Sequence, residues 1–382
     1  METLTNWGPR VTGTQAEQQT LDYIKETLQD YGYEVARQEF DLPAVKASEF
    51  TVGGSSIASA VARNSVTTEE AGVTAELFFA EFGEKTDFTA EASGKIALIA
   101  RGGGVTFQDK VNHAQEAGAV GVIIYDNAEK EEPLSYSATS EIPAIGITKA
   151  QGESLKESLG EAKIIINVVE QRTSSNIIAK KYPENSNMDN EIVYITAHVD
   201  SVPGAPGAND NATGTAAALE MARVLKDQPL DKELRIVFVG AEEIGLVGSR
   251  YYANSLSEEE RTRSIANFNM DMVATAWENA TAIYTNTVSG EANLVTESAN
   301  KVAKIIGTPS ELVLFKRGSS DHVAFDEVGI PAANFIRREP GTHNLEPYYH
   351  NENDVMQYVS KERLKEMIDL VGGAVYSVVR EK

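Results

Sequence analysis

The sequence predicts an α/β protein with a mixed, mostly parallel sheet covered by helices on both faces, and a smaller β-rich domain inserted near the N-terminus. Three observations support this. Apolar runs alternate with helical patterns after Gln171, and the sequence before residue 42 has the patterns of one helix and one strand. Residues 42–168 follow neither of these patterns. Apolar strands that alternate with helices are typical of a parallel sheet buried on both faces.

The N-terminal segment predicts one helix followed by one strand. Leu21, Ile24 and Leu28 recur at helical spacing, and Gly32 is suited to end the helix. Residues 33–40 alternate β-branched or aromatic positions with charged ones, which is typical of a strand. Both elements are expected to join the C-terminal block.

The domain boundaries follow from this division. Residues 1–41 and 169–382 would form a discontinuous main domain, and residues 42–168 the inserted one, whose ends should lie close together so that the host fold can close.

Gly102–Gly104 predict a turn, because the lysine and hydroxyl of a phosphate loop are missing. Strands are expected at 95–100, 120–125, 163–168, 192–197, 234–240 and 266–270, and helices at 107–117, 216–225 and 364–379.

Composition restricts partners and chemistry. The net charge of −23, from 57 acidic and 34 basic residues, argues against nucleic acid, because a phosphate backbone selects clustered lysine and arginine. The simplest interpretation of the charge is solubility, and a preference for cationic substrates is the alternative. No apolar run reaches the roughly 20 residues of a membrane-spanning helix. Cysteine is absent, so a transition metal would be held by His, Asp and Glu.

Histidine and carboxylates stand at the ends of successive apolar runs. His198 and Asp271 end two of them, Glu242 and Glu243 follow a third, and Asp210 lies in a glycine-bounded loop before a helix. A single histidine or glutamate pair in such a place is more often a solvated surface group. Because ligands bind outside the carboxyl ends of strands in open α/β sheets, the joint occurrence indicates a metal site.

The charge balance favours two divalent cations. Two such ions bring four positive charges, Asp210, Glu243 and Asp271 supply three negative ones, and one hydroxide completes neutrality. Ions in two-metal hydrolases lie roughly 3.5–4 Å apart, and a small set of ligands can serve both ions if one carboxylate bridges them. Asp210, in its glycine-bounded loop, is our candidate for that bridge. Asp200, two residues after His198, is the candidate to fix the imidazole tautomer. Nitrogen and oxygen ligands favour zinc, with cobalt or manganese as substitutes, and an accessory calcium is left open.

Six short motifs follow in order along the C-terminal block: His198-Val-Asp200, Gly207-Ala-Asn-Asp-Asn-Ala-Thr-Gly214, Gly240-Ala-Glu-Glu-Ile-Gly245, Asn269-Met-Asp271, Ser320-Asp-His322 and Tyr349-His350-Asn-Glu-Asn-Asp354. Their order and spacing resemble the bacterial cocatalytic-zinc aminopeptidases, a family related to glutamate carboxypeptidase, glutaminyl cyclase and transferrin receptor. The segments 93–102 and 117–125 are similar to the protease-associated domain. The resemblance covers nearly the whole chain.

The resemblance implies the three-layer α/β/α sandwich of zinc exopeptidases and two zinc ions per chain. Asp210 would bridge the ions. His198 and Asp271 would complete the ligands of one ion, and Glu243 and His350 those of the other.

The resemblance also implies the residues of catalysis. Glu242 would act as general base, taking a proton from water and returning it to the leaving amine. Tyr349 matches a position whose phenol, in some members, stabilises the oxyanion. A cis peptide between Asp210 and Asn211 is carried over as well.

The implied function is removal of the first residue from peptides with a free N-terminus. A monomer without membrane insertion is expected, working outside the cell, with the cytoplasm as the alternative compartment. The inserted domain is expected either to cover part of the active-site cleft as a lid or rim, or to provide a binding surface for partners.

Two alternatives stay open. A carboxypeptidase or other hydrolase on the same scaffold needs cations for a terminal carboxylate, and the only basic pairs near the late motifs are Lys316-Arg317 and Arg337-Arg338. A non-catalytic receptor-like protein would lack metal ligands.

Ser320-Asp-His322 does not predict a serine hydrolase, because residues so close in sequence do not form the relay. The glycosylation sequon at Asn211 is interpreted as false, because a glycan there would lie against the bridging ligand.

Overall fold

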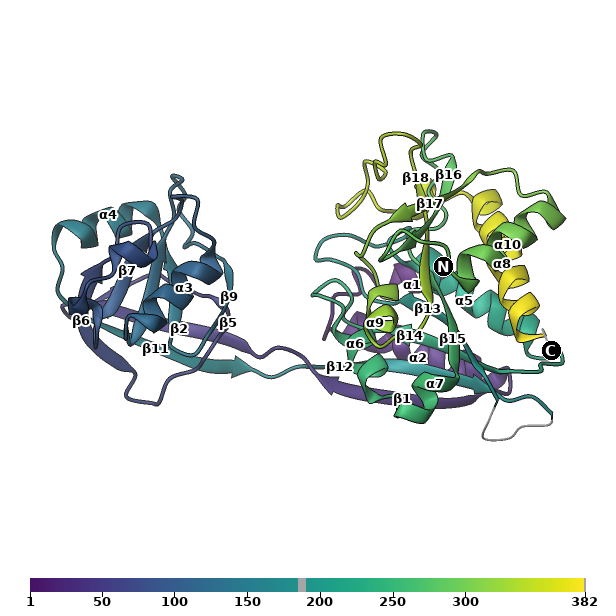
Figure 1. The fold of residues 1–382 in the computed structure, drawn as a ribbon, viewed down its shortest axis with the longest axis horizontal. Helices are drawn as coiled ribbons and strands as arrows, with labels where there is room; N and C mark the ends of the chain where they lie inside the picture. The colour runs from purple at the N-terminus through teal and green to yellow at the C-terminus, as the bar shows by residue number, and fades with distance from the viewer. Residues whose placement is uncertain (185–189, 381–382) are drawn as a thin grey trace. The chain divides into compact units, whose positions relative to one another are not determined.

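The computed structural model describes residues 1–184 and 190–380, which form two compact units (Figure 1). The first unit comprises Met1–Leu42 and Thr173–Lys382, and the second Pro43–Arg172. No helix in the described part of the chain is long and apolar enough to cross a membrane.

The first unit is built on one eight-stranded sheet. Its four central strands run parallel, an antiparallel pairing joins the next strand on each side, and of the two edge pairs one is antiparallel and the other parallel. In spatial order the strands are β1 (Glu34–Asp41), β12 (Thr173–Lys181), β14 (Glu233–Val239), β13 (Ile192–His198), β15 (Ser264–Met270), β18 (Ala332–Arg338), β16 (Ala282–Thr287) and β17 (Leu312–Lys316).

Helices cover both faces of this sheet, as β13 illustrates. Val193 and Ile195 belong to one apolar core, while Ile192 and Tyr194 belong to another on the opposite face. Successive side chains of a strand point to opposite faces, so a strand apolar at every position must be covered twice. The first core includes residues of α2 (Gln15–Asp30), α5 (Ala212–Leu225), α8 (Leu294–Ile306) and α10 (Lys361–Val379), and the second residues of α6 (Val247–Ser255) and α9 (His322–Glu327). The predicted α/β architecture is confirmed.

Helix α5 begins four residues earlier than the sequence pattern predicted. Asn211 Oδ1 accepts a hydrogen bond from the main-chain nitrogen of Gly214 at 3.0 Å, and this cap starts the helix at Ala212. Periodicity alone misses a first turn that is defined by its cap. The early start places the N-terminus of α5 directly after Asp210.

The second unit has its own eight-stranded sheet with an apolar core on each face. Helix α3 (Phe107–Glu116) packs in one core and α4 (Lys149–Glu157) in the other. The strands are, in spatial order, β3 (Ser55–Ile57), β2 (Val45–Val52), β11 (Glu161–Glu170), β6 (Val73–Phe79), β7 (Ile96–Ala100), β8 (Gly121–Tyr125), β10 (Ala144–Ile147) and β4 (Ala60–Val61), while β5 (Arg63–Ser65) pairs with β9 (Ser137–Ser140).

The chain leaves the first unit after β1 and returns to it in β12. These two strands are antiparallel neighbours, and Asp41 lies opposite Thr173. The insertion therefore begins and ends at neighbouring positions of one strand pair in the host sheet.

Candidate metal centre

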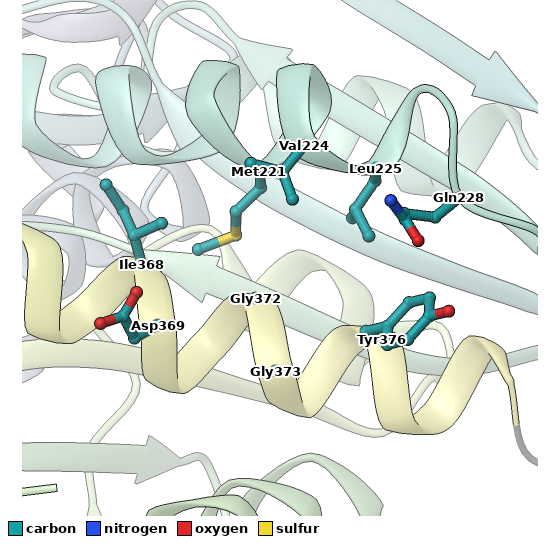
Figure 2. Close-up of a pocket in the computed structure, with 9 residues that line it drawn as sticks. All are labelled: Met221, Val224, Leu225, Gln228, Ile368, Asp369, Gly372, Gly373 and Tyr376. Atoms are coloured by element: carbon teal, nitrogen blue, oxygen red, sulfur yellow. The ribbon is translucent and has the colours of Figure 1, made fainter. Parts of the chain in front are cut away.

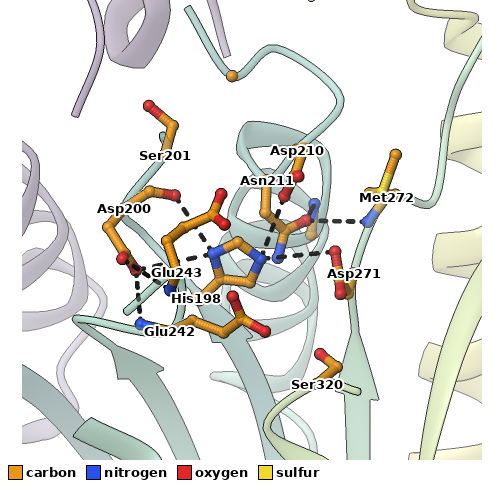
Figure 3. Close-up of polar contacts among 12 residues, drawn as sticks. His198, Asp200, Ser201, Asp210, Asn211, Glu242, Glu243, Asp271, Met272 and Ser320 are labelled. Atoms are coloured by element: carbon orange, nitrogen blue, oxygen red, sulfur yellow. Dashed lines mark hydrogen bonds and ion pairs between the residues drawn. The ribbon is translucent and has the colours of Figure 1, made fainter. Parts of the chain in front are cut away.

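The carboxyl ends of three adjacent parallel strands form the floor of one pocket. His198 is the last residue of β13, Glu242 and Glu243 lie just after β14, and Asp271 comes directly after β15. Figure 3 shows these side chains converging from the three strands. The parallel register explains the convergence, because equivalent strand ends lie at one edge of the sheet.

Asp210 lies between two histidines that are far apart in the sequence. Its Oδ1 is 3.3 Å from Nε2 of His198, and its Oδ2 is 3.2 Å from Nε2 of His350. Asp271 Oδ1 is 3.4 Å from the same nitrogen of His198, and Glu243 Oε2 is 3.1 Å from that of His350. The five side chains therefore form two candidate ligand groups that share Asp210.

The loop that carries Asp210 is held from two directions. Asp354 accepts hydrogen bonds from the main-chain nitrogens of Asn209 and Asp210, at 2.7 and 2.9 Å. On the other side, the buried Asn211 accepts from the nitrogen of Met272 at 3.2 Å. The peptide bond between Asp210 and Asn211 is cis, as the resemblance implied. The position of the shared carboxylate is thus fixed through its own main chain.

Replacing Asp354 should weaken metal binding without touching a ligand. In Asp354→Asn an amide nitrogen would face one of the two main-chain donors, so one hydrogen bond to the Asp210 loop is lost. Since residues that orient ligands typically change metal affinity 10–100-fold, we expect zinc affinity to fall by roughly that factor. A zinc titration against a competing chelator measures it. Glu352→Gln, an exposed neighbour in the same loop, is the matched control and should bind zinc as the natural protein does. Unchanged affinity in Asp354→Asn would disprove this role.

Asp200 differs in detail from its expected role. The nearest acceptor for Nδ1 of His198 is the main-chain oxygen of Asp200 at 3.2 Å, whereas its carboxylate Oδ1 is 3.7 Å away. That carboxylate accepts instead from the main-chain nitrogens of Glu242 and Glu243, at 3.1 and 3.2 Å, and from the hydroxyl of Thr12 at 2.8 Å. Asp200 therefore joins the ends of β13 and β14 and orients both glutamates.

Burial and crowding of like charges control the protonation of the cluster. Burial raises the pKa of Glu243 to about 7, and burial together with neighbouring carboxylates raises the pKa of Glu242 well above its usual range. Burial opposes charge on His350 and Asp210 as well, but hydrogen bonds to Asp210 and Glu243 raise the pKa of His350 to about 10. Hydrogen bonds to His198 and then His350 lower the pKa of Asp210 to about 2. Hydrogen bonds among these side chains therefore oppose the effect of burial on both groups.

The donors present fit divalent metal ions. His198, Asp210 and Asp271 form one group of ligand atoms within 4.8 Å of one another, and Asp210, Glu243 and His350 form a second. The buried Oε1 of Glu243 has no hydrogen-bond partner among residues 1–184 and 190–380, although a buried carboxylate oxygen normally has one. A cation would satisfy it. Neutral imidazole and carboxylate oxygen are ligands that zinc accepts.

Tyr349 lies at the mouth of this pocket. Its side chain is 40% exposed, and its ring stacks on that of His350 at a centroid distance of 3.7 Å. Burial of its inner part and the nearby carboxylates raise the pKa of the phenol, so it keeps its proton. It can therefore donate a hydrogen bond into the pocket.

The remaining histidines do not join the ligand groups. Nε2 of His322 lies 2.9 Å from the main-chain oxygen of Arg317, while Ser320 Oγ accepts from Asn269 at 2.9 Å, so no serine–histidine relay forms. His343 Nδ1 faces the hydroxyl of Tyr284 at 2.8 Å. His113 lies in the second unit, where its Nδ1 is 2.9 Å from the main-chain oxygen of Gly83.

Sequence reasoning missed Arg10 altogether. This buried guanidinium donates to the main-chain oxygens of Val199, Pro206 and Gly207, each at 2.8 Å, and so ties together the segments that carry His198 and Asp210. A lone arginine near the N-terminus carries no pattern that could have revealed this. Asp354 did stand in a recognised motif, and only its role was missed.

A second hollow lies between α5 and α10, with a volume of about 350 Å³ (Figure 2). Apolar side chains such as Met221, Leu225 and Ile368 form most of its described lining. Asp369, also in the lining, pairs with Lys365 on its own helix. Because the lining contains no histidine or paired carboxylates, this hollow does not offer a metal site.

Comparison with known proteins gives consistent matches. Residues 176–375 match peptidase family M28, and residues 61–155 match the PA domain. Aminopeptidase YwaD of Bacillus subtilis is 46% identical over 378 residues, which cover 98% of this chain and 82% of that protein. The structure of BSAP, a zinc aminopeptidase from Bacillus subtilis, superposes with a TM-score of 0.77 at 45% identity, covering 99% of this chain and 92% of the other. The aminopeptidase from Aneurinibacillus sp. strain AM-1 has a TM-score of 0.72 at 35% identity, covering 100% and 94%.

Proposed function

This chain belongs to peptidase family M28 and is a zinc-dependent aminopeptidase with an inserted PA domain, and we propose that it cleaves peptides with two zinc ions and with Glu242 as general base. The observation that carries this proposal is the position of Asp210, whose two carboxylate oxygens each face a different histidine. One carboxylate placed in this way can serve two ions at once.

We assign the ligands by these two groups. His198 and Asp271 would hold one zinc ion, Glu243 and His350 the other, and Asp210 both. When bound, two zinc ions polarise the scissile carbonyl and lower the pKa of water. The geometry of the donors, the unpartnered oxygen of Glu243 and the zinc-dependent relatives support the assignment.

Glu242 would move the proton during hydrolysis. It lies beside the ligands but does not belong to either group that includes Asp210, so its carboxylate stays available. The raised pKa of this carboxylate moves it towards neutrality, where a residue can both accept a proton and return it. The water's proton would pass to Glu242 and then to the leaving amine. Tyr349, which keeps its phenolic proton, would donate a hydrogen bond to the developing oxyanion.

Metal analysis tests the stoichiometry. The purified protein, dialysed and then titrated with zinc, should bind two ions per chain, and activity should follow occupancy. Cobalt or manganese should restore part of the activity after chelation, because both accept the same ligands. A chain fully active with one equivalent of zinc would contradict the two-ion proposal.

Blocked substrates test the requirement for a free amine. We expect Leu-p-nitroanilide to be hydrolysed and its N-acetyl derivative to be inert, because acetylation removes the charge and the donors of the N-terminal amine. Release of the C-terminal residue from N-acetylated peptides would instead favour the carboxypeptidase alternative. The receptor-like alternative predicts no turnover of either substrate.

We further propose that the protein acts as a monomer outside the cell and does not bind nucleic acid. Its net charge of −23 disfavours phosphate backbones. Light scattering would give the mass in solution, and fractionation of the producing cells would locate the protein.

A further inference from the structure

The wall of the zinc pocket contains two arginines that the proposed mechanism does not use. Arg338, the last residue of β18, and Arg317, just after β17, line the pocket together with Tyr349 and His350. Arg338 is only 3% exposed, whereas Arg317 is exposed. Both belong to the basic pairs that a carboxylate-binding site would require.

Neither arginine forms an ion pair within the described part of the chain. Nη1 of Arg338 donates to the main-chain oxygen of His343 at 2.9 Å, but its buried Nε has no partner there. Nε of Arg317 donates to the hydroxyl of Ser319 at 2.9 Å. A buried guanidinium normally pairs with a carboxylate, because desolvating an uncompensated charge is costly. The absence of a carboxylate partner for Arg338 is unexpected in a chain with 57 acidic residues.

The nearby Arg317 disfavours the charge of Arg338. Burial, and then the nearby Arg317, lower the pKa of Arg338 to about 10, although Asp271 acts in the opposite direction. If Asp271 is a zinc ligand, its charge is engaged by the metal. An anion entering the pocket would relieve both the desolvation and the repulsion.

The support behind Arg338 makes it a rigid donor. His343, which accepts its hydrogen bond, has Nδ1 2.8 Å from the hydroxyl of Tyr284 and its ring 4.4 Å from that of Phe315. A guanidinium held by one nitrogen presents its remaining N–H groups in a fixed plane, which suits a carboxylate.

We propose that Arg338, assisted by Arg317, binds a carboxylate of the substrate, so that the enzyme prefers peptides with a carboxylate within one residue of the scissile bond. The free volume of the pocket is about 70 Å³, so a group that reaches its wall must lie next to the reacting carbonyl. The carboxylate could be the C-terminus of a dipeptide or an acidic side chain. This inference rests on the proposed aminopeptidase function and names its substrate class.

Matched substrates with the zinc-loaded protein test this preference. One arm compares Leu-Gly with Leu-Gly-amide, a second compares Leu-Asp-amide with Leu-Asn-amide, and a third compares Glu-p-nitroanilide with Gln-p-nitroanilide. Charge-assisted hydrogen bonds of this kind predict that kcat/KM for the carboxylate-bearing member is roughly ten- to hundredfold higher in at least one arm. The arm that responds identifies the source of the carboxylate.

Variants then assign the preference to the arginines. Arg338→Gln keeps a polar side chain but removes the charge, so the favoured ratio should fall towards one while turnover of the uncharged member persists. Arg338→Lys should keep part of the preference, and Arg317→Gln, at an exposed position, should reduce it. Arg223→Gln, on the surface of α5 and paired with Glu220, is the control and should behave as the natural protein does.

The outcomes separate this inference from the aminopeptidase function. Hydrolysis of Leu-Gly-amide by the natural protein supports that function whatever the ratios are. No carboxylate preference in any arm would overturn the inference, as would a preference that survives in Arg338→Gln. An equal loss on both members of a pair in Arg338→Gln, with an unchanged ratio in Arg317→Gln, would show that Arg338 is purely structural.

Discussion

Glu242→Gln should bind as much zinc as the natural protein and lose nearly all turnover. The substitution keeps the size of the side chain and removes its ability to accept a proton. General acid–base catalysis typically contributes roughly 10²–10⁴-fold to the rate, so kcat should fall by that factor. Because the main-chain nitrogen of Glu242 would still donate to Asp200, the strand ends should stay joined. Metal content and kcat of the zinc-saturated variant are the measurements.

The control for this prediction is Glu220→Gln, an equivalent change at a half-exposed position of α5 that pairs with Arg223, and its kcat should not change. Turnover of Glu242→Gln within a few-fold of the natural rate would remove Glu242 as the base. A variant that loses both zinc and activity would point to a role in metal binding, since Glu242 also lies in a group with His198 and Glu243.

Asp210→Asn should lose both zinc ions together. The change replaces one carboxylate oxygen with an amide nitrogen, which cannot ligate the metal, and removes the charge that faces both histidines. We expect bound zinc to fall from two equivalents to fewer than one, with activity at the level of the metal-free protein. Zinc should raise the melting temperature of the natural protein, because a ligand that binds only the native state stabilises it, and this shift should be nearly absent in the variant.

Asp271→Asn provides the comparison, because Asp271 belongs to one ligand group alone. It should weaken one zinc ion while the second still binds near Asp210, Glu243 and His350. Two tightly bound equivalents in Asp210→Asn would show that this residue does not bridge. Equal effects of the two substitutions would argue against two separate sites.

The architecture was predictable because its signals are local. An apolar run such as Ile192–Ala197 is long enough for a strand and too short for most helices, and it alternates with helical patterns. The spacing of three and four residues between Leu21, Ile24 and Leu28 indicates a helix. The pattern left other elements of the same unit unnamed, among them strands β12, β16, β17 and β18 and helices α6, α8 and α9. It also missed the first turn of α5, which depends on the cap at Asn211.

The clustering of the candidate ligands was predictable for a related reason. His198 and Asp271 stand at the ends of parallel strands, and a parallel sheet brings equivalent ends to one edge whatever the side chains are. The motif order added His350, which no strand pattern contains. These features of the zinc centre thus come from short segments whose relative positions the sheet topology dictates.

The supporting contacts were decided by the tertiary structure alone. Arg10 reaches main-chain oxygens 189–197 residues away in the chain, and Asp354 reaches amides 144 and 145 residues away. No periodicity or spacing reports such contacts, because they depend on how loops of unrelated sequence fold over one another. The same holds for Arg338, which the sequence marks only as half of a basic pair. By itself, then, the sequence determined an α/β zinc aminopeptidase and its candidate ligands, since strand ends and motifs are local. Which groups hold those ligands, and which cations face the substrate, depends on side chains that meet only in the folded chain.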